Sequence, residues 1–96
     1  ANAKSYHAVL GAVMFEAGET LPPLLHEGAI YAAIFSPDGS RVVTASDDHC
    51  AKIWNAETGE LIQKLSGHSG RVNTAAFSTD GKRIVTASLD ASAILW

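Results

Sequence analysis

The amino-acid sequence predicts an all-β protein built from repeated antiparallel sheets, and three observations support this prediction. Residues 26–54 recur as residues 68–96, at a distance of 42 residues, and 15 of the 29 aligned positions are identical. Apolar and polar residues alternate over short stretches in both copies, which is the period of a β-strand. Asp-Gly pairs and single glycines separate these stretches. A repeat period near 40 residues is typical of four-stranded blades arranged in a ring.

The first repeat predicts one complete four-stranded antiparallel sheet. Its expected strands are residues 30–36, 41–46, 51–55 and 60–65. Asp38 and Gly39 form the first turn, because glycine accepts a positive φ and aspartate can hydrogen-bond its own turn backbone. His49 and Gly59 lie in the next two turns. Residues 66–71 lead to the second repeat.

The second repeat predicts three strands, at residues 72–78, 82–88 and 92–96, and lacks a fourth. Upstream of both repeats, residues 10–15 resemble a degenerate third strand, and residues 20–25 are expected to be a fourth strand. Pro22 and Pro23 have no N–H to donate, so this fourth strand suits only the outer edge of a sheet. We therefore expect an N-terminal segment (1–25) with a closing strand at about 20–25 and a poorly defined start, a complete blade (26–67) and an incomplete blade (68–96).

Particular residues carry a resemblance to the WD40 family of β-propellers. Gly67 and His68 open a repeat, FSPDG and FSTDG follow the first strands, TASDD and TASLD follow the second strands, and Trp54 and Trp96 close the third strands. The first repeat departs from the family pattern, since Leu25 replaces the usual glycine and Asn55 the usual aspartate. The resemblance implies WD40-type blades, about two in each chain, which complete a six- or eight-bladed ring when several chains assemble.

The resemblance also implies a structural hydrogen-bonded tetrad in each repeat. The expected members are His26, Ser46, Asp48 and Trp54 in the first repeat, and His68, Ser88, Asp90 and Trp96 in the second. Thr44 and Thr86 share the strand faces of the two serines, and the serines are the expected partners. Ser, His and Asp are also the members of a catalytic triad. A catalytic set is normally needed once, whereas this one recurs in each repeat, so we expect no enzyme and no catalytic residue.

Cofactor and metal sites are not expected. Asp47, Asp48, His49 and Cys50 include metal-ligand types, but neighbouring side chains on a strand or turn point apart, and the matching residues of the second repeat are inert. The glycines stand singly at turns, without the spacing of a phosphate-binding loop.

Composition excludes several other classes of protein. The formal net charge is −3, and the seven Lys and Arg residues are scattered, so there is no basic stripe for nucleic acid. The longest apolar run, residues 8–15, is too short to span a bilayer, and no membrane contact is expected. The single cysteine forms no intrachain disulfide, which fits a reducing compartment and predicts a cytoplasmic protein.

The predicted function is a non-catalytic scaffold that binds proteins or peptides. By resemblance, the contact residues of the partner-binding face are Tyr31, Asp47, Asn73 and Leu89. The other expected partners are further copies of the chain, in a trimer or tetramer, with residues 20–25 of one copy completing the sheet of residues 72–96 in the next. The alternative is a purely structural, engineered or excised piece of a propeller with no ligand of its own.

Overall fold

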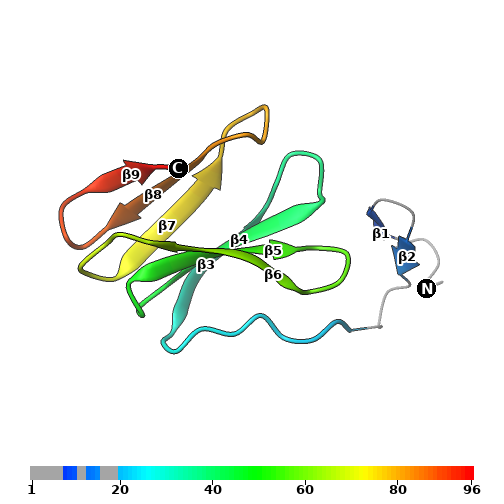
Figure 1. The fold of residues 1–96 in the computed structure, drawn as a ribbon, viewed down its shortest axis with the longest axis horizontal. Helices are drawn as coiled ribbons and strands as arrows, with labels where there is room; N and C mark the ends of the chain where they lie inside the picture. The colour runs from blue at the N-terminus through cyan, green and yellow to red at the C-terminus, as the bar shows by residue number, and fades with distance from the viewer. Residues whose placement is uncertain (1–7, 11–12, 16–19) are drawn as a thin grey trace.

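The structure is a computed structural model that describes residues 8–10, 13–15 and 20–96, and every described element is a β-strand. Figure 1 shows three antiparallel sheets: a small hairpin and two larger sheets that lie against each other. The hairpin pairs β1 (Ala8–Leu10) with β2 (Val13–Phe15). The strands of the four-stranded sheet are β3 (Ile30–Phe35), β4 (Arg41–Ser46), β5 (Cys50–Asn55) and β6 (Leu61–Ser66), in that order. The three-stranded sheet is β7 (Val72–Phe77), β8 (Ile84–Ser88) and β9 (Ala93–Leu95).

The two larger sheets agree with the repeats in the sequence. Their strands begin and end within about two residues of the expected positions, and the two sheets have the same irregularity, a bulge between Ile30 and Ala32 in one and between Val72 and Thr74 in the other. The turns have the expected chemistry. Gly39 has a φ of 75°, and the carboxylate of Asp38 accepts hydrogen bonds from the backbone N–H and the hydroxyl of Ser40.

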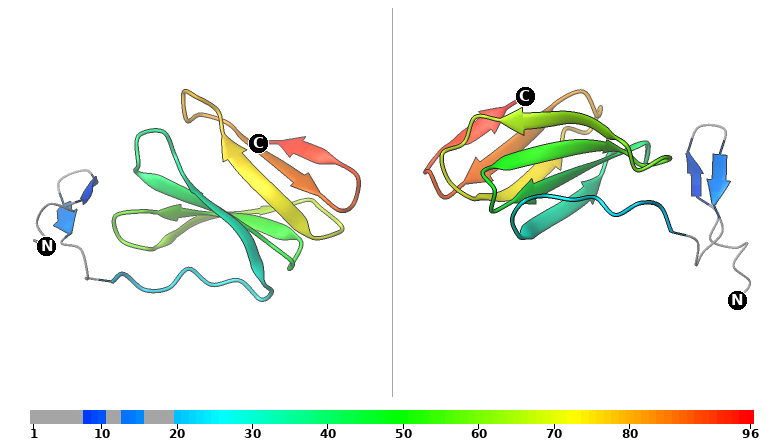
Figure 2. Two further views of the ribbon diagram at one scale, coloured as in Figure 1. Left: turned by 180° about the vertical axis from the view of Figure 1, so that it is seen from behind. Right: turned by 60° about the horizontal axis from the view of Figure 1, so that its bottom comes forward.

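The N-terminal strands were predicted less well. The single strand expected at residues 10–15 is instead the β1–β2 hairpin, with residues 11–12 outside the described residues. Residues 20–25 are not a strand, although they run beside the four-stranded sheet (Figure 2, right). A strand needs a partner edge, and Pro22 and Pro23 cannot donate to one. Instead, the Lys52 ammonium group donates to the Leu25 carbonyl oxygen at 2.8 Å, which ties the segment to the sheet.

The core lies between the two larger sheets. The four-stranded sheet contributes Val43, Ala45, Ala51, Ile53 and Leu65, and the three-stranded sheet contributes Val72, Ala75 and Ile84. These side chains are at most 6% exposed. Each large sheet therefore packs one face into the core. The face that the first sheet uses is equivalent, in the repeat, to the outer face of the second sheet. The outer faces of the pair retain exposed apolar side chains, including Phe35 (64% exposed) and Leu95 (72% exposed).

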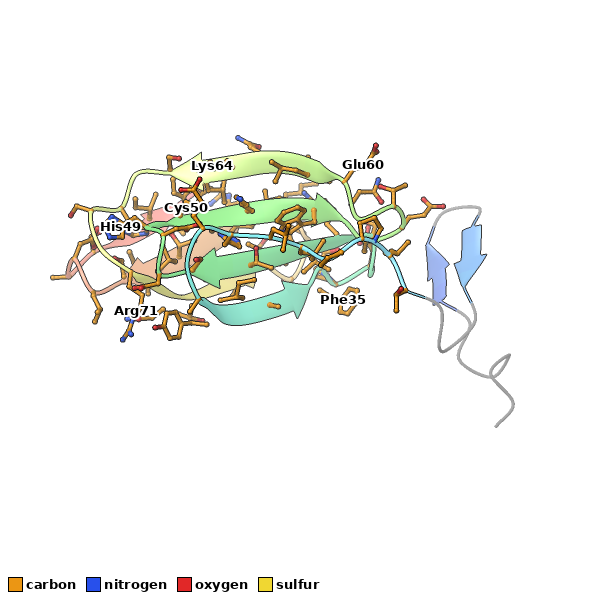
Figure 3. The ribbon with its side chains drawn as sticks, turned by 90° about the horizontal axis from the view of Figure 1, so that it is seen from below. Phe35, His49, Cys50, Glu60, Lys64 and Arg71 are labelled. Carbon is orange, nitrogen blue, oxygen red and sulfur yellow. The ribbon has the colours of Figure 1, made fainter. Side chains whose placement is uncertain are left out.

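Figure 3 places the labelled side chains at the two ends of the sheets. His49, Cys50 and Arg71 lie at one end, with the turns that follow β4 and β8. Phe35 and Glu60 lie at the opposite end, with the Asp38 turn. The face predicted to bind partners and the turn containing Asp38 are therefore at opposite ends of the blades.

Candidate functional site

A chain of hydrogen bonds links four side chains across the first sheet. The Trp54 indole N–H donates to the Thr44 hydroxyl oxygen at 2.8 Å, and this hydroxyl lies 2.6 Å from His26 Nε2. His26 Nδ1 lies 2.8 Å from the Asp48 carboxylate. Because indole N–H can only donate, the Thr44 hydroxyl accepts from Trp54 and has its own hydrogen free for His26 Nε2. In neutral His26, the Nδ1–H then donates to Asp48, so all four groups are satisfied.

The second sheet repeats this network. His68 Nδ1 lies 2.9 Å from the Asp90 carboxylate and Nε2 lies 2.7 Å from the Thr86 hydroxyl, which accepts from the Trp96 indole N–H at 2.9 Å. Among the described residues, no buried side-chain nitrogen or oxygen lacks a partner. The same geometry in two sheets fits a structural role, since each copy ties the loop before a sheet to its second and third strands and to the turn between them.

The choice of Ser46 and Ser88 as the hydroxyl partners was wrong. Thr44 and Thr86 hold that position, while the two serine hydroxyls accept from the backbone N–H groups of Asp48 and Asp90 at 3.1 and 3.0 Å. The strand register explains the difference. Trp54 is paired with Val42, so the indole lies diagonal to Thr44 but two residues further from Ser46. Counting the residue pairs of the β4–β5 hairpin from its turn would have identified Thr44 as the hydroxyl beside Trp54.

The carboxylates of the two networks are held in their charged form. Burial raises the pKa of Asp48, but hydrogen bonds from the Cys50 thiol, His26 and backbone N–H groups outweigh burial and hold that pKa well below its usual value of 3.8. In the second sheet the Ser92 hydroxyl is the main cause of a similarly lowered pKa for Asp90. Both carboxylates therefore remain ionised hydrogen-bond acceptors across the neutral and mildly acidic range.

Cys50 lies where the second sheet has Ser92, and it joins His26 and Asp48 in a cluster of metal-ligand types. Their ligand atoms all lie within 4.8 Å of one another. His49, which belongs to the metal-ligand run in the sequence, is exposed and outside this cluster. The Cys50 thiol donates to Asp48 at 2.9 Å, and burial, followed by the Asp48 carboxylate, raises the thiol pKa to about 11. A cation here would have to displace the hydrogen bonds that complete the network.

The predicted partner-binding residues lie at the end of the blades that contains His49. Tyr31 is 47% exposed and Leu89 is 62% exposed, Asp47 is exposed, and Asn73 is half-buried. The backbone N–H groups of Asp47 and Leu89 donate to the carbonyl oxygens of Ala29 and Arg71 at 2.8 and 2.9 Å. Equivalent loops of the two sheets are therefore fixed in equivalent ways.

Arg71 connects the two sheets at this face. Its guanidinium group lies 4.4 Å from the centre of the Tyr31 ring, and its Nε donates to the Asn73 side-chain oxygen at 2.9 Å. The structure therefore brings Tyr31 and Asn73 together through a residue that was not among the predicted site residues. Its position just before β7, across from β3, was the available signal, since a long side chain there can reach the neighbouring sheet.

In the part of the chain that the structure describes, no helix has the length and apolar character needed to cross a membrane.

Comparison with known proteins agrees with the repeats and the sheets. The family model described as "WD domain, G-beta repeat" matches residues 21–55 and 59–96. WD repeat-containing protein 38 of Mus musculus is 44% identical over 42 residues, which are 44% of this chain and 14% of that protein. WD repeat-containing protein 37 of the same species is 44% identical over 43 residues, 45% of this chain and 9% of that protein.

A third relative is Denticleless protein homolog B of Xenopus laevis, which is 38% identical over 45 residues, 47% of this chain and 6% of that protein. The matched part is thus a small fraction of each of these relatives. The family model, in contrast, covers most of the present chain in two consecutive matches, the first including β3–β5 and the second β6–β9. The chain therefore belongs to the WD40 repeat family.

Proposed function

We propose that this chain is a non-catalytic scaffold that binds a protein or peptide on the face formed by Tyr31, Asp47, Asn73 and Leu89. WD40 repeats are generally protein-interaction modules. The carrying observation is the Arg71 guanidinium stacked on the half-exposed Tyr31 ring across two sheets. Aromatic and arginine side chains contribute much of the binding energy at protein interfaces. Stacking and the bond to Asn73 hold the guanidinium in place, so less conformational entropy is lost on binding.

A random peptide library displayed on phage tests this face without a known partner. Peptides selected on the wild-type chain should bind Tyr31→Ala and Arg71→Ala at least about tenfold more weakly, the effect of losing about 1.4 kcal/mol. Glu60→Ala is the matched control, because Glu60 is exposed and lies at the opposite end of the blades (Figure 3). Selected peptides that bind both face variants as tightly as the wild type would show that another surface recognises them.

The second part of the proposal is that copies of the chain complete a ring, with residues 20–25 of one copy as the fourth strand beside β9 of another. Within the described residues, β9 has a neighbour on one side only. Each copy contributes two blades, so about three or four copies would give the six or eight blades of a typical propeller. The contact is head to tail, because different surfaces of the two copies meet.

The groove beside residues 20–25 supports this arrangement. It has a volume of about 200 Å³ and lies between Leu21, Pro22 and Leu24 on one side and Phe35, Val42 and Trp54 on the other. A second cavity lies between the two large sheets, with Leu65 of β6 on one side and Ile84 and Trp96 on the other. Ile84 and Trp96 are the repeat counterparts of Val42 and Trp54. The likeness between the groove and this cavity supports residues 20–25 as the outer fourth strand of a preceding blade, whose other three strands would be β7–β9 of another copy.

Light scattering coupled to size exclusion tests the ring. Over a concentration series, the 96-residue chain of 10.1 kDa should reach the mass of three or four copies. A folded monomer at all concentrations would contradict the ring.

The alternative is a structural piece of a longer propeller with no ligand of its own. One observation favours it, since the matched relatives contain the repeat within much longer chains. This alternative predicts a polydisperse or unfolded sample and no selected peptides.

A further inference from the structure

We infer that Arg83 of one copy stacks on Phe35 of the next copy and donates a hydrogen bond to its Gly39 carbonyl oxygen. The inference rests on the proposed ring and identifies the residues that would join one copy to the next. It comes from the joint between the two large sheets of a single chain, where the repeat-equivalent residues already meet.

Within the chain, Arg41 of β4 reaches from the first sheet to the second. Its guanidinium group lies 5.3 Å from the centre of the Phe77 ring, and Nη2 donates to the Gly81 carbonyl oxygen. Phe77 packs against the core, and Gly81 is buried. A planar guanidinium can stack on a ring and donate at its edge at the same time, which a lysine ammonium group cannot do.

The repeat counterparts of Arg41 and Phe77 do not meet within one chain. Arg83, 42 residues after Arg41, is exposed, and Phe35, 42 residues before Phe77, is 64% exposed. Arg83 lies just before β8 of the three-stranded sheet and Phe35 lies on β3 of the four-stranded sheet. One chain therefore cannot bring them together in the way that Arg41 meets Phe77. A second copy can, if its first sheet packs on the second sheet of the first copy.

The apolar faces follow the same rule. Val43 and Ile53, which are 0% and 6% exposed in the joint, correspond to Val85 and Leu95, which are 39% and 72% exposed. On the other side of the joint, buried Val72 and Ala75 have the exposed counterparts Ile30 and Ala33. The exposed faces at the two ends of the chain are thus repeat copies of two surfaces that already fit each other. This selects a second copy as the occupant.

The turns that meet in the joint also fit. A side chain built at Gly81 would lie 3.6 Å from the Pro37 ring, so the two Asp-Gly turns touch. At the inferred joint Gly39 of the next copy would meet Thr79, the counterpart of Pro37. The acceptor is a glycine carbonyl in both turns, so the change from proline to threonine does not remove it.

Two charge changes test the contact, because Phe35 is 64% exposed and Arg83 is also exposed. We expect Phe35→Lys and Arg83→Glu each to raise the concentration at which half the chains assemble by about tenfold or more. One chain carrying both changes should regain part of this loss, because the introduced carboxylate meets the introduced ammonium group of the next copy. His49→Asp is the control and should assemble like the wild type, because His49 is exposed and lies at the opposite end of the sheets from Phe35 (Figure 3).

The outcomes separate this contact from the ring itself. A wild-type chain that assembles, with both single variants assembling at the same concentration, would overturn the Arg83 contact and leave the ring standing. A wild-type chain that is monomeric at every concentration would overturn both. Circular dichroism of dilute samples, with melting temperatures equal to that of the wild type, establishes that each variant is folded.

Discussion

At the scale of single residues, the Thr44 hydroxyl is the central group of the first network because it both accepts from Trp54 and donates to His26. Replacing Thr44 by valine keeps the shape and leaves a buried indole N–H and an imidazole nitrogen without partners. We expect Thr44→Val to lower the free energy of unfolding by about 1–3 kcal/mol. Ser46→Ala, which removes only the hydroxyl that accepts from the Asp48 backbone N–H, should cost about 1 kcal/mol or less. Urea unfolding measures both.

Thr44→Ser is the conservative control, since it retains the hydroxyl and should recover most of the stability lost in Thr44→Val. A larger loss for Ser46→Ala than for Thr44→Val would mean that the serine is the more important hydroxyl.

The lowered carboxylate pKa values make a prediction for acid stability. Asp48 and Asp38 have lower pKa values in the folded chain than the usual 3.8, and that of Asp38 falls to about 2 because of hydrogen bonds from Ser40 and Ser36. Such groups stabilise the fold above pH 3.8, and this stabilisation is lost as the pH falls toward the folded-state values. The melting temperature should therefore decrease from about pH 4 to pH 2, and less steeply in Asp48→Asn than in the wild type. Calorimetry at fixed salt measures this, and parallel curves for the two chains would contradict it.

Residue identity alone predicted histidine, aspartate and tryptophan in the network but not the hydroxyl. Thr44 and Ser46 point to the same face, so alternation could not separate them, and only the pairing of β4 with β5 does. Arg71 was not among the predicted site residues for a similar reason. Its contact with Tyr31 joins two sheets, and the distance between sheets is not contained in the local sequence pattern.

At the scale of elements, the turns after β4 and β8 are less favourable than those made by glycine. His49 and Ala91, at equivalent positions, have φ angles of 73° and 71°, in the left-handed region that is unfavourable for residues with a Cβ atom. Strand pairing on both sides compensates for this local cost, and the chain reverses direction in the space of a few residues. The repeat thus retains a tight turn without a glycine.

Glycine at such a turn should relieve the strain. We expect Ala91→Gly to raise the free energy of unfolding by about 0.5–1 kcal/mol, the relief of a left-handed conformation less the greater freedom of the unfolded chain. The reverse change, Gly81→Ala at a φ of 73°, should lower it by about 1 kcal/mol, because an added Cβ has room but the backbone angle disfavours it. Thermal unfolding of the pair measures both, and changes of the same sign would contradict the argument.

The strands of the two repeats were predictable because the alternation of apolar and polar residues and the turn residues are local signals. Both signals occur in each of the two repeats. Residues 20–25 were predicted as a strand from their place before His26. In the structure this segment pairs with none of the sheet edges, so it is not a strand. The apolar residues among residues 10–15 fit either one long strand or part of a hairpin. Only the pairing of β1 with β2 distinguishes the two.

At the scale of the whole molecule, the contribution of a residue to stability depends on whether a neighbouring sheet covers its face. Val43 and Val85 are repeat equivalents, yet Val43 is 0% exposed and Val85 is 39% exposed. Val43→Asp buries an unpaired charge and should destabilise the dilute chain by about 3 kcal/mol or more. Val85→Asp should change the free energy of unfolding of the dilute chain by about 0.5 kcal/mol or less. It should nevertheless block assembly at high concentration.

Denaturant unfolding of dilute samples, with light scattering of concentrated ones, measures both effects. Equal destabilisation of the dilute chain by the two changes would mean that the outer face of β8 is as well packed as the inner one of β4.

The joint made by Arg41, Phe77 and Gly81 has a consequence for how such chains change length. All its parts recur after one step of 42 residues, so the gain or loss of one such unit in a gene adds or removes a whole sheet without creating a new kind of surface. The angle at which each sheet meets the next fixes how many sheets make a full circle. How those sheets are divided among polypeptides is a separate matter, which duplication or fission can alter while the assembled architecture stays the same.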